Sequence, residues 1–264
     1  MDTPRISASA YSNTAPLVWS FLYGRERGNV ELIMDNAPAR SAELLSQGRV
    51  GAALVPVFAY QSIDDVKLIR DVCVGAKEKV RSVCLVTRGG ELADAKSVAL
   101  DTSSRTSVAL TQIIFREFLG FEPEWQASPP DIDRMLDAAD AALIIGDPAL
   151  ALSADPAYRT FDLVELWRSF TGLGFIFAMW MTRSESIVID FAAARDEGLA
   201  HSADIAANYA GEIGLDVREM QTYLTRNITY TPDDSMTEGM ALYFRLAEKH
   251  GLIEGNKPLL FANQ

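Results

Sequence analysis

Three clusters of small polar residues stand where a strand-like stretch ends and a helix-like stretch begins, at residues 11–14, 102–107 and 146–147. A fourth polar pair, Arg81 and Ser82, lies within an apolar strand-like run. The N-terminus of a helix carries unpaired N–H groups and a partial positive charge. It can therefore hold a carboxylate or a phosphate without a neighbouring lysine. The clusters predict a site for an anionic ligand.

The cluster at 102–107 is the strongest of the three, because it combines one arginine, Arg105, with five hydroxyl residues: Thr102, Ser103, Ser104, Thr106 and Ser107. Helix capping accounts for only one of these hydroxyls, since a single Ser, Thr, Asn or Asp side chain caps a helix. The surplus favours a ligand. At Asp147 two interpretations stay open, because this residue precedes Pro148 and helix capping alone would explain it.

The usual signals for metal or nucleotide chemistry do not occur in this sequence. It contains no CxxC pair, HExxH, P-loop, GxGxxG or GxS nucleophile pattern. His201 and His250 fall in the C-terminal helical region, so we expect them at the surface. Cys73 and Cys84 lie in apolar runs typical of buried thiols. The sequence predicts neither a metal site nor a cofactor.

The chain is acidic, with a formal net charge of −12 over 264 residues. This charge disfavours nucleic acid and anionic membranes as partners, so a small molecule is the expected partner. No run approaches the ~18 apolar residues of a membrane span. The N-terminus lacks the charged and apolar regions of a signal peptide, which predicts a cytoplasmic protein. The oligomeric state is not indicated.

Strand-like and helix-like patterns alternate through most of the chain. We expect strands at 5–10, 30–35, 50–57, 66–75, 80–89, 97–101, 123–128, 141–147 and 175–183. We expect helices from Pro16 onward and at 38–48, 131–140 and 161–172. In the segment 102–120 we expect a polar loop that runs into a long amphipathic helix ended by Gly120. Four further helices, at 186–198, 202–212, 216–226 and 234–249, form a C-terminal tail. The aromatic residues Trp167, Phe175, Phe177 and Trp180 are expected in the core.

The pattern restarts at Gly89 and Gly90, which indicates two α/β lobes. The first would comprise residues 1–87 and 179–264, and the second residues 88–178. The runs at 80–87 and 175–183 would cross between them. Ligands of open α/β sheets bind beyond the carboxyl ends of the strands, so two facing sheets predict a ligand cleft between the lobes.

Six segments occur in a characteristic order: "AYSNTAPL", "GAALVPVFAY", "RSVCLVT", "VALDTSSRTSVAL", "DAALIIGDPAL" and "DLVELWRSFTGLGFIFAMW". Together they resemble the chorismate dehydratase family of the futalosine route to menaquinone, from about residue 6 to residue 183. The resemblance implies a two-lobed α/β fold like that of type II periplasmic solute-binding proteins. It also implies a hydro-lyase that eliminates water from chorismate to give 3-[(1-carboxyvinyl)oxy]benzoate without a cofactor.

The resemblance also implies a set of site residues. Three are candidates for catalysis: Asn13, Ser82 and Asp147. The candidates for substrate binding are Ser12, Val55, Pro56, Ser104, Arg105, Thr106, Ser107, Ile145 and Gly146. Two groups are open as the acceptor of the C3 proton, the Asp147 carboxylate and the enolpyruvyl carboxylate of the substrate itself. The second would be catalysis by positioning.

Two other functions fit the same fold. A cytoplasmic solute-binding or sensor protein would bind a ligand without chemistry, and fold alone does not exclude it. The related 1,4-dihydroxy-6-naphthoate synthase uses a catalytic histidine in its second lobe. Residues 88–178 contain no histidine, which counts against this alternative.

Overall fold

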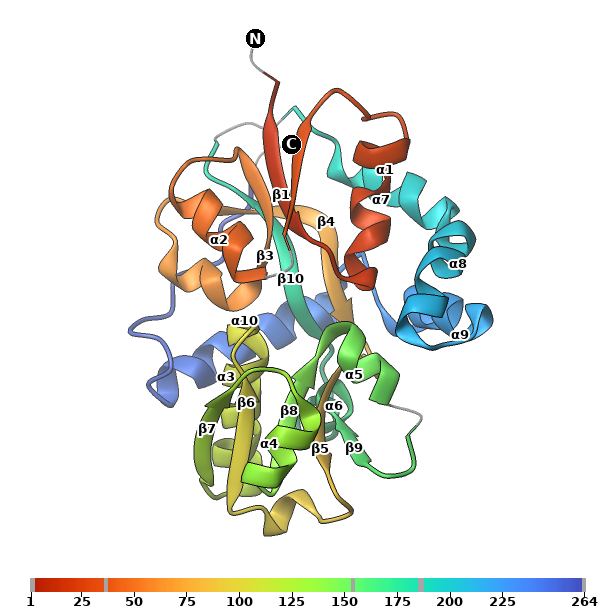
Figure 1. Ribbon diagram of the computed structural model, residues 1–264. Coiled ribbons are helices and arrows are strands. Elements are labelled where there is room, and N and C mark those ends of the chain that lie inside the picture. Colours follow the sequence, from red (N-terminus) through yellow and green to blue (C-terminus); the bar gives the residue numbers. More distant parts are fainter. Residues whose placement is uncertain (1–2, 36–37, 153–154, 185–187, 263–264) are drawn as a thin grey trace.

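Two five-stranded sheets, one above the other in Figure 1, form the framework of the molecule. The computed structural model describes residues 3–35, 38–152, 155–184 and 188–262. The strand order is β2-β1-β3-β10-β4 in the first sheet and β7-β6-β8-β5-β9 in the second. The mixed α/β class predicted from the sequence is confirmed.

The first sheet combines parallel and antiparallel pairs. Its strands are β1 (Arg5–Ser9), β2 (Glu31–Asp35), β3 (Ala52–Pro56), β4 (Lys67–Ala76) and β10 (Phe175–Thr182). β1 lies parallel to β2 and β3, whereas β10 runs antiparallel to β3 and β4. Between the strands come η1 (Ser12–Thr14), α1 (Ala15–Tyr23), α2 (Pro38–Ser46) and η2 (Val57–Ser62). Pro16 lies in the first turn of α1, where a missing N–H leaves no hydrogen bond unmade.

In the second sheet, two strongly apolar strands, β8 and β5, lie at interior positions of the strand order. Its strands are β5 (Val83–Thr87), β6 (Ser97–Asp101), β7 (Glu124–Ser128), β8 (Ala141–Ile145) and β9 (Arg159–Asp162). Every residue of β5 and β8 is buried, as expected of continuous apolar runs in a covered sheet. The other elements are η3 (Leu92–Asp94), α3 (Arg105–Ile113), η4 (Ile114–Leu119), α4 (Ile132–Ala138), α5 (Gly146–Leu152) and α6 (Leu163–Thr171). Gly120 ends the α3–η4 helix in a left-handed conformation, as predicted.

The C-terminal region is helical, as predicted. Its elements are α7 (Phe191–Ala200), α8 (Ser202–Ile213), α9 (Val217–Thr222), η5 (Tyr223–Asn227) and α10 (Asp234–Lys249). Residues 186 and 187 of the helix predicted at 186–198 lie outside the described residues, and α7 begins only at Phe191, where Asp190 caps it. Figure 1 shows α10 at the level between the two sheets, and it packs against both β10 and α3. The tail therefore contacts both halves of the molecule.

Two sequence predictions need correction. The segment at 161–172 was expected to be helical throughout, but Phe161 and Asp162 belong to β9, a four-residue edge strand antiparallel to β5. Short edge strands carry too little alternation to be recognised from sequence. The expected crossing strands also stay within one sheet each, because β5 belongs to the second sheet and β10 to the first. The division into lobes remains a prediction, and the sheets favour boundaries just before β5 and just before β10.

One large hydrophobic cluster joins the two sheets. It contains Leu54 and Met179 of the first sheet together with Leu85 and Leu143 of the second. Among the described residues, no helix has the length and apolar character needed to cross a membrane.

Candidate active site

A cavity of about 610 Å³, counted to its open mouth, lies between the two sheets. The polar residues that line it are Ser9, Tyr11, Asn13, Thr14, Ser82, Ser104 and Ser107. The apolar residues and the glycine that line it are Leu54, Pro56, Val74, Val80, Val83, Ile145, Gly146, Phe177 and Ala178. The cavity has the mixed lining of a site for a small, partly polar molecule.

The three polar clusters of the sequence meet at this cavity. Asn13 lies in η1 just after β1, and Ser104 and Ser107 lie at the start of α3 just after β6. Gly146 follows β8 directly. The cavity is therefore built at the carboxyl ends of strands from both sheets, where ligands of open α/β folds bind.

The N-terminus of α3 presents two hydroxyl groups to the cavity. Ser104 caps the helix, because its side-chain oxygen accepts the N–H of Ser107 at 3.2 Å. The Ser104 hydroxyl also donates to the Oγ of Ser107 at 3.0 Å. The partial positive charge of a helix N-terminus favours an anionic group beside these hydroxyls.

Two other residues of this cluster do not line the cavity. The Thr106 Oγ1 accepts the backbone N–H of Phe58 at 3.2 Å, and the Thr106 carbonyl accepts the hydroxyl of Tyr243 at 3.1 Å. Arg105 is exposed, with its guanidinium 5.2 Å from the centre of the Phe58 ring. Thr106 thus links α3 to η2 and α10, and Arg105 covers the outside of the same junction.

Ser12 and Asp147 bind each other across the two halves. The Asp147 carboxylate accepts the Ser12 hydroxyl and, at 3.2 Å, the Ser12 backbone N–H. Neither residue is among those that line the cavity. Burial raises the pKa of Asp147, and the hydrogen bonds from Ser12 oppose this rise. In this arrangement the carboxylate holds η1 against α5.

The remaining predicted residues lie on β3 and β8. Leu54 and Pro56, two positions apart on β3, both line the cavity. Val55 lies between them and points to the opposite face of the sheet, as strand alternation requires. Ile145 and Gly146 both line it. Gly146 has a φ of +69°, and a Cβ there would lie 2.8 Å from Cε1 of Tyr11, so only glycine fits.

Tyr11 links the cavity to a buried carboxylate. Its hydroxyl forms a side-chain hydrogen bond with Ser103. Ser103 in turn donates through its hydroxyl to Asp101 Oδ1 at 2.6 Å, so Tyr11 is the donor to Ser103. Asp101 is 1% exposed. Burial raises the pKa of Tyr11, which keeps the phenol protonated.

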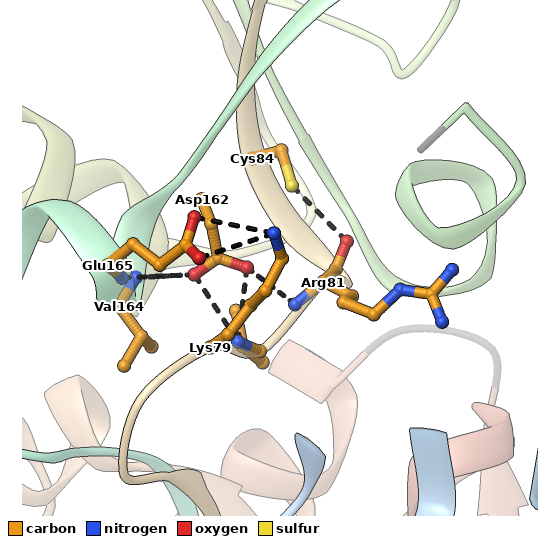
Figure 2. A network of polar contacts seen from close by, with 7 residues as sticks. Lys79, Arg81, Cys84, Asp162, Val164 and Glu165 are labelled. Atoms are coloured by element: carbon orange, nitrogen blue, oxygen red, sulfur yellow. Dashed lines mark hydrogen bonds and ion pairs between the residues drawn. The ribbon is translucent and has the colours of Figure 1, made fainter. Parts of the chain in front are cut away.

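Ser82 is held in place at the point where the chain passes from the first sheet to the second. The Asp162 carboxylate accepts the backbone N–H groups of Val80 and Arg81 and also caps α6 through Val164 (Figure 2). Arg81 adopts the left-handed conformation, with a φ of +63°. A non-glycine residue in that conformation is strained unless its surroundings fix it. The hydrogen bond to the Asp162 carboxylate supplies that support at Arg81, the residue directly before Ser82.

Ser82 and Asn13 share a partner that the sequence interpretation missed. Tyr223 of η5 donates its hydroxyl to Ser82 Oγ at 2.8 Å and also forms a hydrogen bond with the Asn13 side chain. Tyr223 is completely buried. No local sequence signal marks it, because the contact joins positions 141 residues apart.

Phe177 also departs from expectation. It was predicted to lie in the core together with Trp167, Phe175 and Trp180, which are indeed buried. Phe177 instead lines the cavity, next to Ala178. Strand β10 runs along the cavity at this point and contributes an aromatic surface to it.

All of the described residues that line the cavity are uncharged. An anionic ligand would therefore be bound by hydroxyl, amide and N–H groups and by the dipole of α3 rather than by salt bridges. Among the described residues, no three His, Cys, Asp or Glu side chains are grouped so that they could hold a metal ion.

A sequence profile of a family described as menaquinone biosynthesis matches residues 4–249. This chain belongs to the menaquinone biosynthesis family. A chorismate dehydratase of Thermus thermophilus is 31% identical over 236 residues, which cover 81% of this chain and 84% of that protein. The family predicted from the six sequence segments is therefore confirmed.

Solved structures show the fold of this family member. A protein of Archaeoglobus fulgidus aligns with a TM-score of 0.69 at 17% identity, covering 94% of this chain and 98% of that one. The periplasmic aliphatic sulphonate binding protein of Escherichia coli aligns with a TM-score of 0.67 at 17% identity, covering 99% and 94% of the two chains. These similarities confirm the periplasmic-binding-protein fold, and at this identity they concern the fold alone.

Proposed function

We propose that this protein is a chorismate dehydratase, a carbon–oxygen hydro-lyase of menaquinone biosynthesis. In the reaction, chorismate loses the hydrogen at C3 as a proton and the hydroxyl at C4 as hydroxide. The two combine as water, and the ring becomes aromatic in 3-[(1-carboxyvinyl)oxy]benzoate. Nothing is oxidised or reduced overall, so the reaction requires no redox cofactor.

The observation that carries this proposal is the uncharged lining of the cavity. Chorismate brings two carboxylates of its own, and a site with several hydroxyl donors and a helix N-terminus suits such a ligand. The apolar residues Leu54, Val83 and Phe177 suit the ring. The similarity to the Thermus thermophilus chorismate dehydratase supports the same substrate.

Within this proposal, the N-terminus of α3 binds one substrate carboxylate through Ser104, Ser107 and the N–H groups of the first helical turn. Thr106 has a structural role instead, because it does not line the cavity and its side chain accepts the backbone N–H of Phe58. Asn13 and Ser82 orient the second carboxylate or the leaving hydroxyl. The interlobe position of the cavity favours closure of the lobes around the substrate, which would exclude water.

We assign the role of base to the enolpyruvyl carboxylate of the substrate. This group can fold toward C3, and the protein then needs only to hold that conformer. The geometry favours this group over Asp147, because the Asp147 carboxylate is bound by Ser12 and does not line the cavity.

We also propose that the protein is located in the cytoplasm.

The test is an assay of the purified protein with chorismate and no added cofactor, followed by ultraviolet absorbance and chromatography. We expect conversion to the enolpyruvyl benzoate. Binding of chorismate without turnover would instead indicate a solute-binding or sensor protein. If the protein neither bound nor converted chorismate, this result would contradict the proposed substrate.

A further inference from the structure

We propose that Tyr223 is a positioning residue that fixes the hydrogen-bonding directions of Ser82 and Asn13 at the cavity. This inference rests on the proposed function, because it concerns how those two residues meet the substrate. Tyr223 comes from the C-terminal tail, far in sequence from both, and does not itself line the cavity.

The fold holds Tyr223 firmly. It is the first residue of η5, a π-helical turn that continues α9, and such turns often occur at functional sites. The Tyr223 carbonyl accepts the N–H of Ile228 at 3.0 Å. Thr229 and Tyr230, which follow Ile228, pair with the edge strand β4. The Thr229 N–H donates to the Gly75 carbonyl at 2.8 Å, and the Tyr230 carbonyl accepts the Cys73 N–H at 2.9 Å. The phenol is thus anchored to the first sheet.

The direction of each hydrogen bond follows from the number of protons. A phenol has one proton, and Tyr223 gives it to Ser82 Oγ at 2.8 Å. Burial raises the pKa of Tyr223, so this proton is kept at any working pH. The hydrogen bond between Tyr223 and Asn13 must then be donated by the Asn13 amide group to the phenol oxygen.

These directions leave one donor and one acceptor for a ligand. The Ser82 hydroxyl accepts from Tyr223, and among the described residues the acceptor within reach of its own proton is the Val80 carbonyl, at 3.5 Å. Within the part of the chain that the structure describes, the donor to the Asn13 carbonyl oxygen is likewise distant, the Thr14 hydroxyl at 3.5 Å. Both distances are at the outer limit of a hydrogen bond. Tyr223 therefore presents Ser82 to the substrate as a donor and Asn13 as an acceptor.

The test is Tyr223→Phe, which keeps the ring and removes only the hydroxyl. We expect kcat to fall about 10- to 100-fold, the effect of losing one buried orienting hydrogen bond, with little change in KM. The matched control is Tyr230→Phe, since the Tyr230 hydroxyl is buried and has no hydrogen-bond partner among the described residues. This control should keep wild-type kinetics. Melting curves verify that folded proteins are compared.

A double-mutant cycle with Ser82→Ala separates positioning from a purely structural role. If Tyr223 acts through Ser82, adding Tyr223→Phe to Ser82→Ala should cost much less activity than it costs the wild type. The positioning role of Tyr223 would be overturned, with the proposed function unaffected, by either of two results. One is that Tyr223→Phe lowers kcat equally in the wild type and in Ser82→Ala, and the other is that Tyr223→Phe leaves kcat unchanged. Lack of turnover by the wild type would overturn the proposed function as well.

Discussion

At the scale of single residues, Asn13 and Ser82 are the groups on which the proposed chemistry depends. Asn13→Ala and Ser82→Ala should each lower kcat/KM roughly 100-fold or more, as loss of one well-placed polar group in an active site does. Ser82→Ala also leaves the buried Tyr223 hydroxyl without its acceptor, which costs about 1–3 kcal/mol of unfolding free energy. Steady-state kinetics and chemical denaturation test both effects. Near-wild-type turnover in both variants would refute their assignment.

Asp147 distinguishes the two candidate bases. If the substrate carboxylate takes the C3 proton, Asp147→Asn should lower kcat by less than roughly tenfold, because only hydrogen bonds to Ser12 are weakened. If Asp147 were the base, kcat would fall by several orders of magnitude while chorismate still bound. Single-turnover kinetics together with calorimetric binding separate these outcomes.

At the scale of elements, sequence patterns located most strands and helices but not the contacts between them. β6 matches its predicted range of 97–101, and the helix from Arg105 ends at Gly120 as expected. These features depend on local periodicity and on one backbone conformation. The edge strand β9 was missed because Asp162 both ends it and caps α6.

The site residues show the same limit. The hydroxyls at 102–107 were recognised together, yet Ser104 and Ser107 line the cavity while Thr106 binds Phe58. Which hydroxyl faces which partner depends on the helical turn and on the neighbouring η2. Asp147 and Ser12 are 135 positions apart, so their contact could not be read from either local pattern. Long-range pairing decides such roles, and it exists only in the folded chain.

The end of α10 offers a test of how the tail attaches to the second half of the molecule. Glu117 of η4 accepts from Lys249 at 2.7 Å and from His250 at 2.9 Å, and these contacts lower the pKa of Glu117. A lowered pKa means that the contribution to stability is present above the unfolded-state pKa and is lost as pH falls through the folded-state pKa.

Glu117→Gln should therefore destabilise the protein at neutral pH, by about 0.5–1 kcal/mol for a partly exposed ion pair. The difference from the wild type should shrink in acid, because the wild-type carboxyl is then protonated too. Thermal melting of both proteins between neutral and acidic pH measures this. A difference that stayed constant over the whole range would show that charge is not the cause. Glu254→Gln, at an exposed position, is a suitable control.

At the scale of the whole molecule, the two sheets share their core. The large cluster includes Leu54 of the first sheet and Leu143 of the second, and α10 packs against elements of both halves. The Tyr243 hydroxyl of α10 also donates to the Thr106 carbonyl of α3. Unfolding one half would expose apolar surface of the other, so we expect the chain to unfold as one cooperative unit.

Scanning calorimetry should accordingly show a single transition whose calorimetric and van't Hoff enthalpies agree. Chorismate binds between the two halves in the proposed function, so it should move this one transition to higher temperature without splitting it. Two separable transitions, with only one shifted by chorismate, would mean that the halves are independently stable and that the ligand contacts just one of them.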